Sequence, residues 1–225
     1  MGQALGNVLP LAVAIAVFPV PIIATVLTVG SNRGRAKGLV FVLAWCVGLT
    51  VVGALVLAFA DGVDASDHGE TATWVAVVLL ALGVLLFAAA IKQWRGRPTA
   101  GRVAPIPSWM RAIEDFTMAK AFGAGFALSA LNPKNVLLVI AATLEIAALG
   151  LPASEEIAAL LVFVVIASVG VFAPLVLSVA LGDRSRAPLD TLRNWMALNN
   201  ATIVAVLFVV IGAKLIGDAV TAFFS

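Results

Sequence analysis

The segment Asn132-Pro133-Lys134-Asn135 lies in the middle of a long apolar stretch and constrains the fold more than any other feature. Proline cannot continue a helical hydrogen-bond pattern, and a lysine ammonium is costly inside a lipid bilayer. A second interruption, formed by Pro19 and Pro21, falls in the first apolar stretch. Paired interruptions in corresponding parts of two halves are typical of secondary transporters, in which broken helices form the binding site. The alternative is two ordinary proline kinks.

The composition places the chain in a membrane. Hydrophobic residues make up 62% of the 225 residues, charged residues only 12%, and the mean hydropathy is +1.11. Soluble domains do not reach such values. Six apolar stretches are long enough to cross about 30 Å of hydrocarbon as helices, and they cover residues 5–30, 38–60, 72–92, 119–146, 156–181 and 198–222. The alternation that a membrane β-barrel requires is absent, so we expect an all-α integral membrane protein.

Charged residues alternate between the connections. The first, third and fifth are basic and contain Arg33, Arg35, Lys37, Lys92, Arg95, Arg97, Arg102, Arg111, Lys120, Arg184, Arg186 and Arg193. The second and fourth are acidic and contain Asp61, Asp64, Asp67, Glu70, Glu145, Glu155 and Glu156. By the positive-inside rule the basic connections are cytoplasmic, which predicts that both termini lie outside the cell membrane.

Three helices precede the central basic connection, so the two halves have opposite orientations. The sequence therefore predicts a 3+3 inverted repeat within one transmembrane domain, residues 1–225, with helices one and four broken by proline. Repeat one covers about 1–92, the basic linker about 93–117 and repeat two about 118–225. The segments Gly83-Val84-Leu85-Leu86 and Gly212-Ala213-Lys214-Leu215 also look alike. The alternative is six helices without internal symmetry.

The second break carries the best candidate substrate site. Pro133 leaves a backbone carbonyl unpaired, and such groups are tolerated at membrane depth only where protein or a wet cavity satisfies them. The amides of Asn132 and Asn135 add donors and acceptors, and Lys134 adds a cation for phosphate, sulfate or carboxylate. Pro19 and Pro21 are expected to open the backbone of the first break in the same way. The alternative for Lys134 is a side chain that snorkels to water.

A second group of candidates lies in the last apolar stretch. Lys214 and Asp218 are four residues apart and share a helix face, which favours either a structural ion pair or an outer gate. Asn199 and Asn200 stand at the expected start of the helix and are interpreted as caps, with substrate contact as the alternative. Glu145 and Asp218 are the candidates for proton coupling.

Other chemistry is absent from the sequence patterns. His68 is the only histidine and stands among acidic residues, without the spacing of a metal site. Nucleotide-binding and catalytic motifs are missing, so we expect no cofactor, no metal and no enzyme activity. The single cysteine, Cys46, excludes an internal disulfide. The basic connections adjoin apolar helices, which favours lipid headgroups over nucleic acid as partners. Gly48 and Gly53 permit close helix packing and with it a homo-oligomer.

Several segments, taken in order, resemble one family over nearly the whole chain. They are Phe18-Pro19-Val20-Pro21, Ser31-Asn32-Arg33-Gly34-Arg35, Lys92-Gln93-Trp94-Arg95, Leu131-Asn132-Pro133-Lys134-Asn135, Asn199-Asn200-Ala201-Thr202 and Gly212-Ala213-Lys214-Leu215-Ile216-Gly217-Asp218. This set is similar to the actinobacterial GAP/Sap family of glycolipid-addressing and sulfolipid-addressing proteins, which is placed in the lysine exporter (LysE) superfamily. Phe18 departs from the family pattern, which has a small residue before the first proline.

The resemblance implies a six-helix protein of the bacterial plasma membrane that moves a complex lipid toward the cell envelope. We therefore expect an exporter of an amphipathic, anionic lipid or glycolipid that works by alternating access, with that lipid and lipid-synthesis proteins as partners. Two alternatives remain open at this point. One is an exporter of a small solute, an amino acid or a cation, and the other is a non-transporting scaffold of a lipid-synthesis complex.

Overall fold

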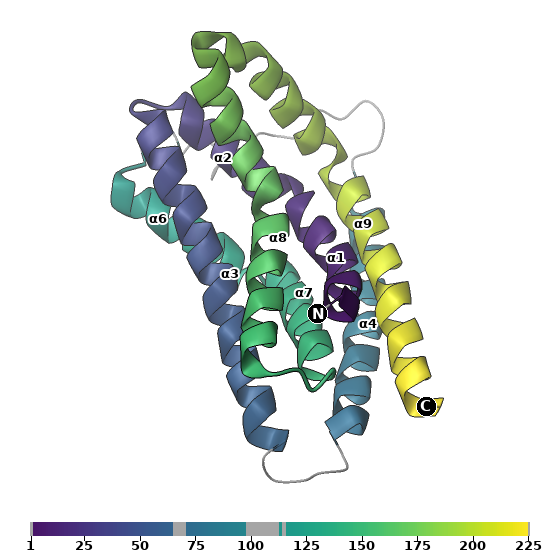
Figure 1. Ribbon diagram of the computed structural model, residues 1–225. Coiled ribbons are helices and arrows are strands. Elements are labelled where there is room, and N and C mark those ends of the chain that lie inside the picture. Colours follow the sequence, from purple (N-terminus) through teal and green to yellow (C-terminus); the bar gives the residue numbers. More distant parts are fainter. Residues whose placement is uncertain (1, 65–70, 98–112, 114–115, 225) are drawn as a thin grey trace.

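The protein is a bundle of helices in the computed structural model, which describes residues 2–64, 71–97, 113 and 116–224 (Figure 1). Every regular element in these ranges is helical, so the expected all-α class is confirmed. In chain order the elements are α1 (Gly2–Ala16), α2 (Pro19–Gly30), α3 (Gly34–Asp64), α4 (Thr71–Arg95), α6 (Met118–Phe126), the π-helix η1 (Ala127–Leu131), α7 (Pro133–Ala147), α8 (Ala153–Leu181), the 3-10 helix η2 (Gly182–Ser185) and α9 (Arg186–Phe224).

The helices are long and apolar enough for a multi-pass membrane protein. Three helical stretches of the described chain qualify by length and composition, namely Gly34–Ala60, Trp74–Arg95 and Ala153–Phe223. The count rises to as many as five if each of two bent helix pairs is one span. The last stretch contains both α8 and α9, and the chain reverses between them at η2 (Figure 1).

Both predicted breaks are present. The pair α1 and α2 is bent by 52°, and the pair formed by α6–η1 and α7 is bent by 57°. Pro19 and Pro133 each occupy the first position of the helix that follows the break. Proline is favoured there because its missing N–H would have no partner in the first helical turn. The predicted interruptions at Pro19 and Pro133 are therefore confirmed.

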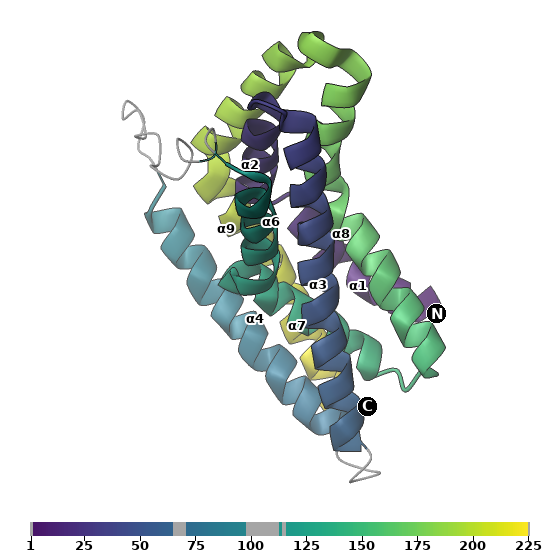
Figure 2. The ribbon, with the colours of Figure 1, turned by 90° about the vertical axis from the view of Figure 1, so that its left-hand side faces the viewer.

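Most of the described basic residues gather at one end of the bundle, here called the basic end, whereas Lys134 and Lys214 lie elsewhere. The basic end contains the α2–α3 turn, η2, the end of α4 and the start of α6, whereas the α7–α8 turn and the C-terminus lie at the opposite end (Figures 1 and 2). The residues concerned are Arg33, Arg35, Lys37, Arg95, Lys120, Arg184 and Arg186. The expected acidic group Asp67, His68 and Glu70, and most of the linker 93–117, lie outside the described residues.

The most extensive packed interface joins α4 to α9, and two glycines lie against each other in it. A Cβ placed on Gly83 would lie 3.0 Å from the carbonyl oxygen of Gly212, and one on Gly212 would lie 3.1 Å from the carbonyl oxygen of Gly83. Small residues at a crossing let two helix backbones touch, which is how helices associate in a lipid environment. These are the two glycines of the look-alike segments in the sequence.

At each break a glycine of a neighbouring helix lies against the residues that precede the interruption. A Cβ on Gly170 of α8 would collide with the carbonyl oxygen of Ala16, the last residue of α1. A Cβ on Gly48 of α3 would collide with the hydroxyl of Ser129 in η1. Gly53 faces the side chain of Leu160 in the same close manner. The expected packing role of Gly48 and Gly53 is thus confirmed, and Gly170 is an equivalent position that the sequence did not reveal.

We expect Gly170→Ala to destabilise the protein by about 1–3 kcal/mol, because the added methyl group meets backbone that cannot move aside. Gly217→Ala is the matched control, since a Cβ at Gly217 of α9 would meet nothing within 4 Å and alanine is the better helix former. Thermal unfolding in detergent micelles should show a lower Tm for the first variant alone. Equal Tm values for both variants would contradict the close contact at the first break.

Candidate functional site

The second break is built around a π-turn and a buried asparagine. Asn135 is fully buried, and its Nδ2 donates to the carbonyl oxygen of Leu128 at 2.7 Å. The Ser129 hydroxyl donates to the carbonyl oxygens of Gly125 and Phe126, both at 3.0 Å. These side chains satisfy carbonyls near the interruption, which cannot be left bare in hydrocarbon. Asn135 therefore stabilises the break itself.

Two buried polar atoms on neighbouring helices have no hydrogen-bond partner among the described residues. These atoms are Asn135 Oδ1 and Trp45 Nε1. Asn135 belongs to α7, and Trp45 stands one helical turn before Gly48 on α3, a helix that packs against α7 and η1. Buried polar atoms without partners are rare in native proteins and ask for a water molecule or a ligand. Asn135 Oδ1 and Trp45 Nε1 therefore require a water molecule or a ligand as a partner.

Asn132 and Lys134 form the start of α7. Asn132 is the N-cap, and its side-chain oxygen accepts from the backbone N–H of Lys134 at 3.2 Å. The Lys134 side chain is partly buried and makes no ion pair within the described part of the chain. A helix N-terminus already carries partial positive charge, so the ammonium beside it strengthens a field that attracts anions. Pro133 and Leu131 next to it are exposed on the bundle surface, Leu131 to 70%.

The first break is apolar and closed. Phe18 is extended and buried, and its ring meets that of Phe208 on α9 edge to face, with 5.9 Å between the centroids. Pro19 and Pro21 are buried as well, and the carbonyl oxygen of Pro21 accepts from the Thr25 hydroxyl at 3.0 Å. The two breaks are therefore alike in backbone geometry but differ in chemistry. Of the predicted substrate residues, only those of the second break offer polar side chains.

An ion cluster joins α7 to α9. The Lys214 ammonium lies 2.8 Å from both carboxylate oxygens of Glu145 and 2.6 Å from Oδ2 of Asp218. The Glu145 side chain is only 4% exposed, whereas that of Asp218 is 43% exposed. The predicted pairing of Lys214 with Asp218 is confirmed. The contact of Lys214 with Glu145 was not predicted, and because Glu145 is more buried than Asp218 it forms the stronger ion pair.

The placement of Glu145 in the fourth connection was wrong. The residue lies inside α7, which continues to Ala147, and Glu155 and Glu156 lie in the first turn of α8. A carboxylate is normally excluded from an apolar helix, and this one is accommodated because Lys214 neutralises it. The signal available in the sequence was a lone acid in one apolar stretch and a lone lysine in another.

The interpretation of Asn199 and Asn200 as helix caps was also wrong. Helix α9 begins at Arg186, so both residues lie inside it. Asn199 Nδ2 donates to the carbonyl oxygen of Trp195 at 2.9 Å, and Asn200 Oδ1 is buried without a partner among the described residues. Asn200 stands 14 residues before Lys214, about 21 Å along an α-helix. The four residues predicted to form a gate or coupling site therefore do not form one cluster.

The apolar helices, two pairs of which are bent at a proline, define an all-α, multi-pass membrane protein. The model of the Sap family, the sulfolipid-1-addressing proteins, matches residues 8–221, and the chain belongs to this family. The family resemblance seen in the sequence is thus confirmed. No curated protein and no solved structure gives a significant match to the chain.

We expect Lys214→Met to destabilise the protein by about 3–5 kcal/mol, because it leaves the buried Glu145 carboxylate without its counter-charge. The double variant Glu145→Leu with Lys214→Met should recover most of that loss, since it removes both charges. Asp218→Asn should change the stability by less than about 1 kcal/mol, because the Asp218 carboxylate is solvent-exposed. Thermal unfolding of the purified variants measures all three effects. A double variant as unstable as Lys214→Met would contradict the direct pairing of Glu145 with Lys214.

Proposed function

We propose that this protein moves an anionic amphiphile, a lipid or glycolipid, across the bacterial plasma membrane toward the cell envelope by alternating access. The family is named for proteins that address a sulfolipid, which supports a lipid cargo with an acidic headgroup. In this proposal the protein is a carrier and not an enzyme, and the cargo lipid is its principal partner. Membership of the lysine exporter superfamily is part of the same proposal.

The second break carries the proposal. It combines the Lys134 ammonium, which has no ion pair within the described chain, with the positive end of α7. An anionic headgroup would supply the missing counter-charge. The exposed Leu131 beside it favours cargo that arrives from the side, with its chains still in the lipid. That observation favours a lipid over a small solute, which needs an enclosed path.

The packing pattern supports the proposed 3+3 inverted repeat. If α1–α4 correspond to α6–α9, then the contact of α3 with α6 has its counterpart in the contact of α8 with α1. The repeat symmetry exchanges α4 with α9, so their contact is symmetric, and Gly83 lies against Gly212 there. Gly48 and Gly170 take equivalent places beside the two breaks. Rocking of one repeat against the other is the usual basis of alternating access.

One departure from this symmetry indicates which end is closed. Helix α1 packs against α7 at the end opposite the basic end, whereas no comparable packing joins α2 to α6 among the described residues. The Glu145–Lys214–Asp218 cluster holds α7 to α9 on the closed side. By the positive-inside rule the basic end is cytoplasmic, with both termini outside. We infer a state that is open to the cytoplasm and sealed outside, with the ion cluster as the outer gate.

We expect Lys134→Met to lower the rate of lipid translocation about tenfold or more, the equivalent of losing one hydrogen bond to a charged group. The assay uses purified protein in proteoliposomes that contain a fluorescent phosphatidylglycerol, with protection from a membrane-impermeant quencher as the readout.

Lys120→Met is the matched control, because Lys120 lies in the first turn of α6, on the same broken helix but away from the break. It should transport like the native protein, and all three proteins should have the same Tm. Translocation that Lys134→Met leaves unchanged would contradict the assignment of the break as the headgroup site. Export of an amino acid or a cation without any lipid movement would instead support the small-solute alternative.

A further inference from the structure

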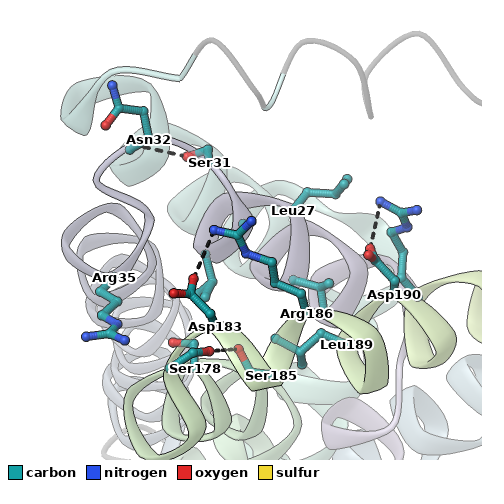
Figure 3. A pocket seen from close by; sticks show the side chains of 15 residues that line it. Leu27, Ser31, Asn32, Arg35, Ser178, Asp183, Ser185, Arg186, Leu189 and Asp190 are labelled. Atoms are coloured by element: carbon teal, nitrogen blue, oxygen red, sulfur yellow. Dashed lines mark hydrogen bonds and ion pairs between the residues drawn. The ribbon is translucent and has the colours of Figure 1, made fainter.

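A cavity of about 480 Å³ opens at the basic end, far from the second break in the chain (Figure 3). Its walls come from the end of α2, the start of α3, η2 and the start of α9. Sequence reasoning did not find it, because its residues come from two chain segments about 150 positions apart. The volume is in the usual range for pockets that bind small molecules or headgroups.

The polar part of the wall is rich in arginine. Arg35, Arg186 and Arg193 line the cavity together with Asp183 and Asp190, so the lining keeps a net positive charge. Within the described residues Arg35 makes no ion pair. Arginine carries the planar donor group that matches phosphate, sulfate and carboxylate oxygens. The cavity thus presents the donors that an anionic group requires.

The two ion pairs in the wall are weak enough to exchange. Arg186 lies 3.0 Å from Asp183, with side chains that are 79% and 92% exposed, and Arg193 lies 3.4 Å from Asp190, with side chains that are 30% and 58% exposed. Ion pairs that are open to water on one or both sides contribute little to stability. Figure 3 shows the Arg186 side chain reaching toward Asp183. An incoming anion can therefore take the place of either carboxylate at small cost.

The turn that supports this wall has a fixed backbone. Gly182 has a φ of +57°, a conformation that glycine adopts without strain. The Ser185 hydroxyl donates to the Gly182 carbonyl oxygen at 2.6 Å, and the Ser178 hydroxyl donates to that of Leu175 at 2.8 Å. A guanidinium nitrogen of Arg35 lies 3.6 Å from the place where a Gly182 side chain would begin. The turn thus brings Arg35 of α3 beside η2.

The other part of the wall is apolar. Val26 and Leu27 of α2 and Leu189 of α9 line the cavity and are themselves buried in the protein. A free inorganic anion gains nothing from such a surface, whereas the first carbons of a lipid chain or glycerol backbone do. The combination of arginines on one side and aliphatic residues on the other matches an amphiphile.

We infer that this cavity binds the phosphate, sulfate or carboxylate headgroup of an amphiphile at the basic end, as a loading site distinct from the break at Lys134. The inference rests on the proposed function, because it supplies the step by which cargo reaches the open side of the carrier. The site lies on the side that the packing of α1 against α7 leaves open.

The test is equilibrium binding to the full-length protein in a neutral detergent, measured by isothermal titration calorimetry. The probe is dihexanoyl phosphatidylglycerol, with glycerol 3-phosphate as the soluble anion and dihexanoyl phosphatidylcholine as the amphiphile without net charge. We expect the first probe to bind most tightly. Arg35→Gln combined with Arg193→Gln should weaken its binding about tenfold or more, because each arginine supplies charge-assisted hydrogen bonds.

Arg184→Gln with Arg33→Gln is the matched control, since both residues lie at the basic end but neither lines the cavity. It should keep the native affinity. Equal weakening by both double variants would overturn the cavity assignment and leave a general surface attraction. Equally tight binding of glycerol 3-phosphate would overturn the amphiphile and identify a free-anion site.

The same variants separate this inference from the proposed function. If binding at the cavity fails while Lys134→Met still abolishes translocation, the loading site is wrong and the carrier stands. If binding depends on Arg35 and Arg193 but no lipid crosses the proteoliposome membrane, the carrier is wrong and the cavity remains a lipid-binding site.

Discussion

The need to satisfy every backbone polar group in hydrocarbon governs this structure, because two membrane helices are interrupted inside the bundle. Pro19 and Pro133 end the hydrogen-bond pattern, and the protein then covers the exposed groups by different means. At the first break the Phe18 ring and α9 seal the interruption, with Gly170 receiving the end of α1. At the second, the Asn135 amide reaches back to Leu128. Apolar side chains line the first break, whereas at the second the buried Asn135 Oδ1 has no hydrogen-bond partner among the described residues.

The charges then divide the molecule into two unlike ends. At one end a buried carboxylate and an ammonium hold α7 to α9, so opening that end requires a strong ion pair to separate or to find new partners. At the other end the ion pair of Arg186 with Asp183 is exposed and that of Arg193 with Asp190 is half-exposed, so both are weaker than the buried pair. The proposed carrier of an anionic cargo would use this asymmetry, because the cargo must exchange easily at the loading side while the far side stays closed. Lys134 begins the same helix, α7, that carries Glu145 of the buried ion pair.

The sequence predicted those features that depend on local chemistry. The apolar stretches predicted an all-α, multi-pass membrane protein, and proline within them predicted the breaks at Pro19 and Pro133, because each of these signals lies within a single stretch of the chain. Glu145 and Lys214 are 69 positions apart, and a lone acid in one apolar stretch and a lone lysine in another do not by themselves show that the two residues meet. The cap assignment of Asn199 and Asn200 was wrong because α9 begins at Arg186 and continues through this polar stretch. The sequence did not predict the cavity either, because its lining residues are brought together only where the end of α2 meets the start of α9.

The central claim is that the two breaks let the ends of the bundle open in turn. Distances between spin labels in lipid nanodiscs test it most directly, using a Cys46→Ser background with Asn32→Cys and Arg184→Cys at the basic end, and Ala148→Cys and Thr221→Cys at the other. These four positions are exposed. Alternating access predicts two distance populations for each pair, with Lys214→Met raising the long-distance population at Ala148 and Thr221 and lowering it at the basic end. One narrow population at both ends, unchanged by Lys214→Met, would contradict it.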